Sequence, residues 1–319
     1  SKVLKVYPDG KTAVAVFFEP LLSGEERPVK QLMFYETGKI QQELDLGMVD
    51  QEHPAFAVWK STTVPNGLCV DFYPDGTHKK AIFYQQGFVS GVVKEFFSNG
   101  KLKSQQGYQN GRLQGALVIF YEDGKKKEEG QYVDGKLEGS YIGYYPDGAR
   151  ASLLSYKEGQ LEGKALEWHE NGSLKIEKIF HNNVLHGDGK NPALVAYNDK
   201  HNIVEVLDFF ENQPSGQHFK YHDNGKKSYI AFYKAGKKNG LEEFFAEDGV
   251  LLGQGFYRDD LPVGRHWRNH PNGQQEYIAE FDEEGNLKQP ITEYDEKGQK
   301  KKFLYRLKTI MNKSLAVMF

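Results

Sequence analysis

Histidine spacing is the first feature of this 319-residue chain that could support chemistry. Its ten histidines include two pairs, His218 with His222 and His266 with His270, whose members are four residues apart. Such pairs invite comparison with metal sites. On a β-strand, however, residues four apart face the same side but lie roughly 13 Å apart, too far to share one ion. We therefore expect these histidines to occupy polar strand positions and to bind no metal.

No other group of side chains forms a better catalytic arrangement. Adjacent carboxylates such as Glu128-Glu129 point to alternate faces of a strand, where they are ordinarily solvated. The motifs G-x-S-x-G and H-E-x-x-H and the P-loop are absent from the sequence. Cys69 is the only cysteine, which excludes intramolecular disulfides and cysteine-cluster metal sites. The sequence thus predicts a protein that is not an enzyme and uses no cofactor.

Glycine recurs at a fixed step of 24 residues, and this step indicates the elements that carry the side chains. The regular members are Gly76, Gly100, Gly124, Gly148, Gly172, Gly225, Gly249 and Gly273. Gly10, Gly38 and Gly298 belong to the series less regularly. A period in this range is typical of stacked supersecondary units rather than of one closed globule.

Each unit has the pattern of a β-hairpin centred on its glycine. Around Gly124, Phe120 lies four residues before the glycine and Tyr132 eight after it, and Gly135 and Gly139 follow. The residue before the glycine is usually Asp or Asn, which bonds its own backbone, while Gly takes φ > 0. β-prone runs around such a turn predict a hairpin. We expect the Gly-x-x-x-Gly pair to mark the crossing to the next hairpin, and the recurring aromatics to stack between repeats as the core.

Irregular spacing predicts how the array is interrupted. His201 lies 24 residues before Gly225, in the place of a turn glycine. Longer steps indicate insertions near residues 47–60 and 187–191. Counted in this way, residues 1–305 form about twelve hairpins. The predicted fold is an all-β, elongated, single-layer solenoid of consecutive antiparallel hairpins.

Composition limits the choice of partners. Lys+Arg 41 against Asp+Glu 44 gives a net charge of −3, which argues against a nucleic-acid footprint. No run approaches the roughly 20 apolar residues of a membrane span. The sequence leaves localisation open, because the chain begins at Ser1 without a recognisable leader and a removed leader remains an alternative.

These repeats resemble a known family. Paired aromatics, Asn/Asp-Gly-Lys, a tyrosine eight residues later and then Gly-x-x-x-Gly are similar to the MORN repeat, and units such as FFSNGKLKSQQGYQNGRLQG are most similar to its bacterial, YwqK-like variant. The resemblance implies a twisted sheet of hairpins. It also implies binding functions, namely protein scaffolding, phospholipid attachment or antitoxin-like binding, and it supplies no catalytic residues.

The longer insertion carries the candidate partner-binding residues Phe56, Val58 and Trp59. An apolar cluster is unusual in a loop, and two alternatives stay open. The cluster either packs back on the sheet or offers an exposed anchor to a partner, a role in which aromatic residues are favoured.

The C-terminal segment departs from the hairpin pattern. Leu307, Ile310, Met311, Leu315 and Met318 recur at steps of three and four, which predicts an amphipathic helix over 306–319. The leading expectation is a cap over the last hairpin, since the ends of solenoids must be covered. Docking to a membrane surface and association with a partner or a second copy are the alternatives.

Taken together, the sequence favours a repeat scaffold that binds a protein through an elongated sheet face. Peripheral phospholipid attachment is the alternative, through the lysine runs at residues 125–127 and 300–302 and the C-terminal segment.

Overall fold

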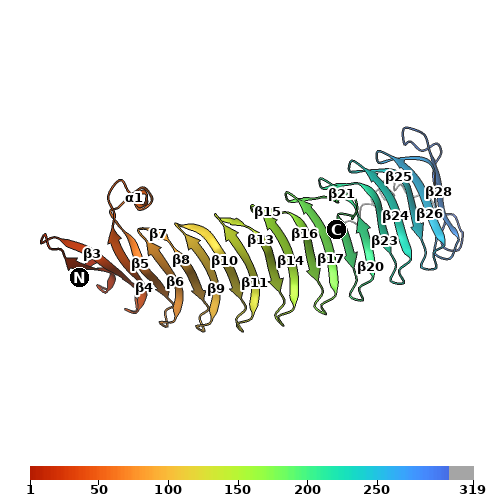
Figure 1. The fold of residues 1–319 in the computed structure, drawn as a ribbon. Coiled ribbons are helices and arrows are strands. Elements are labelled where there is room, and N and C mark those ends of the chain that lie inside the picture. The colour runs from red at the N-terminus through yellow and green to blue at the C-terminus, as the bar shows by residue number, and fades with distance from the viewer. Residues whose placement is uncertain (302–319) are drawn as a thin grey trace. The chain divides into compact units, whose positions relative to one another are not determined.

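The computed structural model describes residues 1–301 (Figure 1). These residues belong to two compact units. Unit 1 is Ser1–Val184, and unit 2 begins at Leu185, within the short strand β18 (Val184–Leu185). Both units consist of antiparallel strands, and the one helix among the described residues is α1 (Pro54–Trp59). The helix predicted over 306–319 lies outside the described residues.

The other strands of unit 1 are β1 (Lys2–Val6), β2 (Thr12–Pro20), β3 (Glu26–Phe34), β4 (Ile40–Met48), β5 (Thr63–Phe72), β6 (His78–Gln85), β7 (Phe88–Val89), β8 (Gly91–Phe96), β9 (Leu102–Gln109), β10 (Arg112–Phe120), β11 (Lys126–Val133), β12 (Lys136–Leu137), β13 (Gly139–Tyr144), β14 (Arg150–Lys157), β15 (Gln160–Leu161), β16 (Gly163–Trp168) and β17 (Leu174–His181). Those of unit 2 are β19 (Leu194–Tyr197), β20 (Ile203–Leu207), β21 (Phe209–Phe210), β22 (Gln213–Pro214), β23 (Gly216–Tyr221), β24 (Lys227–Lys234), β25 (Lys237–Phe245), β26 (Leu251–Arg258), β27 (Leu261–Asn269), β28 (Gln275–Phe281) and β29 (Thr292–Glu293).

Strands that follow one another in the chain pair side by side within each unit. In unit 1, β8 pairs with β9, β9 with β10 and β10 with β11, all antiparallel. In unit 2 the same rule joins β23 to β24, β25, β26, β27 and β28 in turn. Each unit is therefore an open run of hairpins, which confirms the predicted all-β repeat fold.

The turn around each periodic glycine has one geometry. The Gly124 amide donates to the Tyr121 carbonyl (2.9 Å), and the Tyr121 amide donates to the Lys125 carbonyl (2.9 Å). Asp123 Oδ1 accepts from the Lys125 amide (2.9 Å), and the φ of Gly124 is +95°. This is a three-residue loop that ends in a left-handed glycine. Beside it the ladder has a bulge, because Phe120 pairs with Lys126 but Ile119 pairs with Glu128.

The other periodic glycines also have positive φ, between +79° for Gly225 and +98° for Gly76. His201 takes the same place without being a glycine. Its φ is +64°, and its amide donates to the Asn198 carbonyl (2.9 Å).

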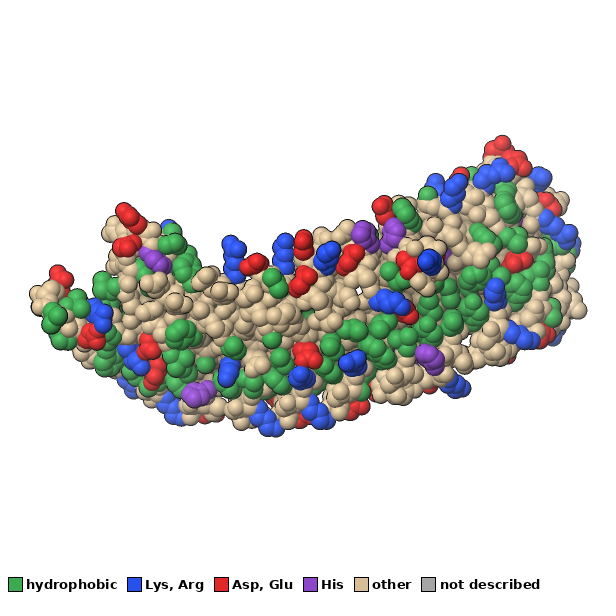
Figure 2. All heavy atoms as spheres, viewed as in Figure 1, with side chains coloured by type: hydrophobic (Ala, Val, Ile, Leu, Met, Phe, Trp, Pro, Cys, Tyr) green, Lys and Arg blue, Asp and Glu red, His purple; other side chains and the backbone are tan. Residues whose placement is uncertain are grey.

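A second turn closes each repeat at the opposite end of the strands. Asp134 and Gly135 have φ of +48° and +82°, the signature of a two-residue type I′ turn. The Gly135 amide donates to the carbonyl of Leu113 in the preceding repeat (2.8 Å). The Gly-x-x-x-Gly pair therefore holds a complete turn at its first glycine, and Gly139 at its second glycine begins the next long strand, β13. Figure 2 shows charged side chains gathered mainly where the turns lie, with apolar side chains between them.

In unit 1 the most buried side chains are small, whereas a core of stacked aromatics was expected. Cys69, Val93 and Ala165 are buried at one equivalent position of unit 1, two residues past a glycine. The aromatics before the turns, such as Phe96 and Phe120, are only half-buried. In a single layer of sheet each side chain is covered only by its neighbours on the same face, and in this unit it is the short side chains that they hide most completely.

Candidate binding surfaces

The insertion after β4 contains the helix α1 rather than a loop. His53 caps its start by accepting a hydrogen bond from the Ala55 amide at Nδ1 (3.2 Å), and the helix ends at Lys60, whose φ is +53°. Ala55 is fully buried against the turn after β6. A Cβ placed on Gly87 of that turn would lie 2.7 Å from the Ala55 Cβ, so this close contact requires glycine.

The three candidate anchor residues divide between the two predicted alternatives. Trp59 packs back on the sheet: its Nε1 donates to the Gly87 carbonyl (2.9 Å), and its ring meets that of Tyr84 edge-on at 6.3 Å. Phe56 is half-buried. Val58 is 64% exposed, and Trp59 keeps 42% of its surface exposed. The helix is thus braced on the sheet while it presents an apolar side to solvent.

A second exposed apolar surface lies on the sheet of unit 1. Leu68 on β5 is directly opposite Phe83 on β6, and both are exposed. Val92, at the matching position of β8, is exposed as well. Three such side chains in one part of a sheet are more than the scattered exposure that needs no explanation.

The lysine run considered for phospholipid binding is tied to the protein. Lys125 Nζ donates to the Pro146 carbonyl of the next turn (2.9 Å), and Lys126 Nζ lies 2.6 Å from Glu129 Oε2. Lys127 Nζ lies 6.0 Å from the centre of the Tyr121 ring. In the second run Lys302 lies outside the described residues. The first run therefore offers less free charge to a membrane than its sequence suggests.

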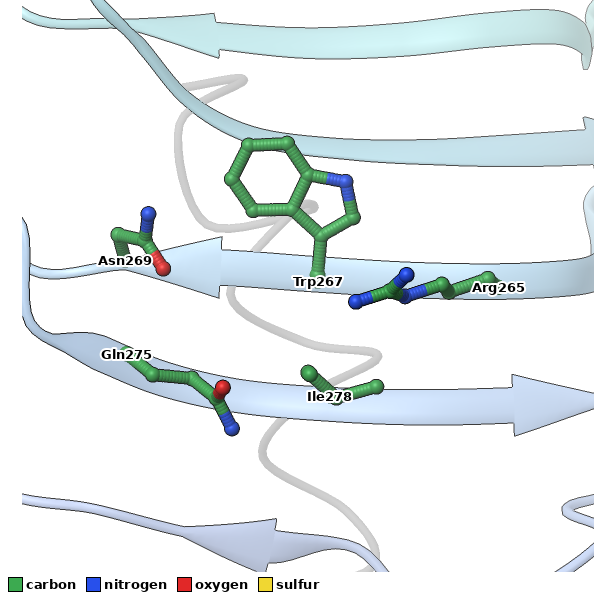
Figure 3. Close-up of a pocket in the computed structure, with 5 residues that line it drawn as sticks. All are labelled: Arg265, Trp267, Asn269, Gln275 and Ile278. Atoms are coloured by element: carbon green, nitrogen blue, oxygen red, sulfur yellow. The ribbon is translucent and has the colours of Figure 1, made fainter.

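An open depression of about 340 Å³ lies on one face of unit 2 (Figure 3). Arg265, Trp267 and Asn269 alternate along β27 and so share this face, and Gln275 and Ile278 line it from β28. Arg265 is exposed and the other four are half-buried. None of these five residues was among the candidates predicted from the sequence.

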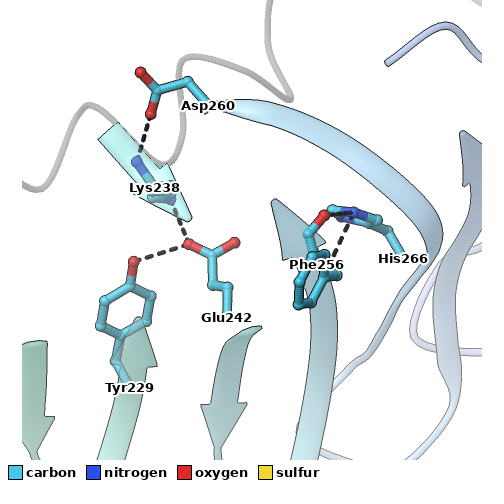
Figure 4. A network of polar contacts seen from close by, with 6 residues as sticks. All are labelled: Tyr229, Lys238, Glu242, Phe256, Asp260 and His266. Carbon is cyan, nitrogen blue, oxygen red and sulfur yellow. Dashed lines mark hydrogen bonds and ion pairs between the residues drawn. The ribbon is translucent and has the colours of Figure 1, made fainter. Parts of the chain in front are cut away.

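A buried polar network lies in unit 2 around Glu242 (Figure 4). Glu242 is two residues past Gly240, the repeat position that Cys69, Val93 and Ala165 hold in unit 1. Glu242 is 5% exposed and forms an ion pair with Lys238, whose side chain is also largely covered. The Tyr229 hydroxyl donates to Glu242 Oε1 (2.8 Å), and the Lys238 amide donates to Asp260 Oδ1 (2.7 Å). Burial, together with the Glu242 charge, raises the pKa of the Tyr229 hydroxyl.

Two of the paired histidines, for which polar strand positions were expected, do lie on strands but are buried, at the same repeat position as Glu242. His218 is 1% exposed, its Nε2 lies 2.7 Å from the Asp208 carbonyl oxygen, and its ring lies 4.4 Å from that of Tyr233. His266 is buried between Tyr257 and Phe281. Burial lowers the pKa of both imidazoles. Imidazole suits this position because it fills space among aromatic rings and bonds a backbone carbonyl.

His222 and His270, the other members of the two pairs, contact the next repeat. The Nε2 atoms of His222 and His270 each lie 2.9 Å from a carbonyl of the next repeat, that of Phe245 and that of Tyr294. Between residues 1 and 301 no group of three or more His, Cys, Asp or Glu side chains is placed to hold a metal ion. No helix in the same part of the chain has the length and apolar character of a membrane span.

Comparison with known families identifies the repeats. Six segments match a family described as the MORN repeat variant: residues 29–45, 90–110, 113–134, 161–182, 214–235 and 238–259. These segments are MORN-variant repeats. Five of them end at the first residue of a two-residue turn of the type formed by Asp134 and Gly135. A MORN unit therefore runs from one such turn to the next. Membership of the YwqK-like subgroup stays a prediction.

Solved structures that align with this chain do not extend the family match. The crystal structure of TcdB2-TccC3 aligns over 92% of this chain and 22% of its own, with 10% identity and a TM-score of 0.14. A mutant Tc holotoxin pore of Photorhabdus luminescens aligns over 92% and 21%, with 10% identity and a TM-score of 0.18. This chain thus spans about a fifth of those chains, and TM-scores this low carry no functional argument. No curated protein gives a significant match.

Neither the buried network nor the depression was predicted from the sequence, although the sequence contains a signal for the network. Two residues past the equivalent glycine, unit 1 has Cys69, Val93, Leu117, Tyr141 and Ala165, whereas unit 2 has His218, Glu242 and His266. A change from mainly apolar side chains to His and Glu at this one repeat position marks the network. At the following repeat position, one residue further along the chain, Trp267 is equivalent to Phe219 and Glu243.

Proposed function

We propose that this MORN-variant chain is a non-enzymatic scaffold that binds a protein partner through apolar surface on unit 1. The repeat family supports a scaffold for protein or membrane-lipid binding. The helix α1 is the feature that favours a protein partner over a lipid. Exposed apolar side chains on a rigidly braced element are suited to a protein interface, because little conformational entropy remains to be lost on binding.

The observation that carries this proposal is the position of Val58. It is among the most exposed large apolar residues of unit 1, on a helix held by the Ala55 contact and the Trp59 hydrogen bond. Trp59 adds the exposed part of an aromatic ring beside it. The exposed row of Leu68, Phe83 and Val92 offers further apolar area on the same unit.

The lipid alternative has less support. Anionic membranes attract lysines at about 1 kcal/mol each when the charges are free to approach the surface. Here Lys125 and Lys126 already have partners, a backbone carbonyl and a carboxylate.

Photo-crosslinking tests the proposal. A crosslinking amino acid replaces Val58 in the full chain, and a matched variant carries it at Val133, which is exposed on β11 of the same unit. The crosslinked protein is identified by mass spectrometry and purified. We expect it to bind the unmodified chain, and Val58→Asp to weaken binding at least about tenfold, a loss typical of a central anchor, while Val133→Asp has no effect.

Two results contradict the proposal. Equal loss of binding in the two Asp variants removes α1 as the interface. Salt-sensitive flotation of the chain with anionic vesicles, with no specific crosslink at position 58, favours the lipid function.

A further inference from the structure

The depression around Trp267 supports a binding function separate from the protein interface on unit 1. β27 places Arg265, Trp267 and Asn269 on one face, and the register sets Ile278 opposite Trp267 and Gln275 opposite Asn269. Figure 3 shows the flat indole of Trp267 between Asn269 and Arg265 along β27, with Gln275 and Ile278 on the adjacent strand β28.

The polar groups of this depression are not used by the protein. Among the described residues, no hydrogen bond or ion pair joins the side chains of Arg265, Asn269 or Gln275 to another part of the chain. Arg268 on the opposite face of β27 is a contrast. Its Nε lies 3.4 Å from Glu276 Oε2, and its guanidinium lies 4.7 Å from the centre of the Phe244 ring. The donors and acceptors around Trp267 therefore remain available to a ligand.

The surroundings narrow the class of ligand. β27 is paired on both sides, with β26 and β28, so no free strand edge is present to add a peptide strand. The depression is open and has only Ile278 as an aliphatic wall, which makes it a poor pocket for the buried anchor of a protein. Glu280 lies opposite Arg265 in the register and offsets its charge, which disfavours phosphate.

We propose that this depression binds a sugar ring of a neutral oligosaccharide. The indole of Trp267 offers an apolar platform for the C–H face of a pyranose. Asn269 and Gln275 amides both donate and accept, as hydroxyl groups do, and the Arg265 guanidinium donates to adjacent oxygens in a fixed fork. An open site with a flat floor and a polar rim suits a ring that lies flat on it.

Nuclear magnetic resonance of the full chain provides the test. The three tryptophans, Trp59, Trp168 and Trp267, give one indole N–H signal each. Maltohexaose, cellohexaose and chitohexaose are titrated separately. We expect at least one of them to shift the Trp267 signal in a saturable way, with a Kd on the order of 0.1–1 mM, and to leave the Trp59 signal unchanged.

Variants establish where binding occurs, with ligand-observed saturation transfer as the readout. Trp267→Leu keeps an apolar side chain but removes the platform and should abolish binding. Gln275→Ala should weaken it at least about threefold, the loss of one hydrogen bond. Phe219→Ala, at the equivalent position two repeats earlier, is the matched control and should bind normally. Thermal melts show that each variant is folded.

Three results overturn the proposal. One is that none of the three oligosaccharides shifts the Trp267 signal. Another is that Trp267→Leu, folded by its melt, binds as tightly as the unmodified chain. The third is that a Gly-Ser hexapeptide produces the same saturable shift as the sugars, which would make the depression a peptide site.

Discussion

The hydroxyl of Tyr73 donates a hydrogen bond to the carbonyl oxygen of Phe96, 2.9 Å away and 23 residues further along the chain. Tyr73 begins one turn, and Phe96 lies just before the equivalent turn of the next repeat. The same bond recurs from Tyr121 to Tyr144 (2.7 Å). Adjacent repeats are thus joined at their turns by a side chain as well as along their strands.

The value of this bond can be measured because the chain contains a natural variant of it. Phe97 occupies the position of Tyr73 in the next repeat and has no hydroxyl. We expect Tyr73→Phe to lower the free energy of unfolding by about 0.5–1.5 kcal/mol, the value of one net hydrogen bond. Phe97→Tyr should leave stability unchanged or raise it. Chemical denaturation of both variants checks this, and a loss in both would show that the hydroxyl does not decide the effect.

Substitution of the left-handed turn glycines should destabilise the protein because of backbone geometry alone. Gly124 has φ of +95°, and a Cβ there would meet no atom within 4 Å. Gly124→Val should nevertheless destabilise by more than about 1 kcal/mol, because a β-branched residue is strained at positive φ. His201→Gly is the reciprocal change and should be neutral or stabilising. An unchanged melting temperature for Gly124→Val would contradict the turn geometry.

The buried ion pair of unit 2 should be costly to break from one side. Glu242→Ala leaves the Lys238 ammonium without its partner and removes the acceptor of the Tyr229 hydroxyl. We expect a loss of about 3–5 kcal/mol, typical of an uncompensated buried charge. The double variant Glu242→Ala with Lys238→Met should recover part of that loss. Denaturation of the two variants decides this, and equal stability would mean that the pair is not electrostatically coupled.

The buried histidines predict a fall in stability on the acid side of neutrality. The pKa of His218 and His266 is lowered in the folded chain, by burial in each case. Above the unfolded pKa of about 6.5 both states are neutral at these residues, so stability is at its full value. Below it the unfolded state binds protons first, and stability is lost as pH falls toward the lowered folded pKa values.

Thermal melts of the full chain between about pH 7.5 and pH 5 measure this effect. The double variant His218→Gln with His266→Gln should lose less stability over that interval than the unmodified chain. An identical pH dependence for the two proteins would show that other groups control the acid transition.

The sequence by itself determined the repeat. The spacing of Gly76 to Gly172 and Gly225 to Gly273 follows from a local requirement, since only a residue that tolerates positive φ can end the three-residue turn. Local chemistry of this kind is legible without the fold. The same register placed His201 in a turn position where no glycine remains.

Tertiary structure decided what faces what. The spacing of four between His218 and His222 excluded a shared ion, but only the packed sheet shows that His218 is buried against Tyr233 and that His222 bonds the next turn. The insertion could have packed or protruded, and it does both, because Ala55 fits against Gly87 while Val58 points outward. Burial depends on neighbours a repeat away and on which face of the strand each residue takes. Trp267 joins Arg265 and Gln275 for that same reason, through the alternation and register of β27 and β28.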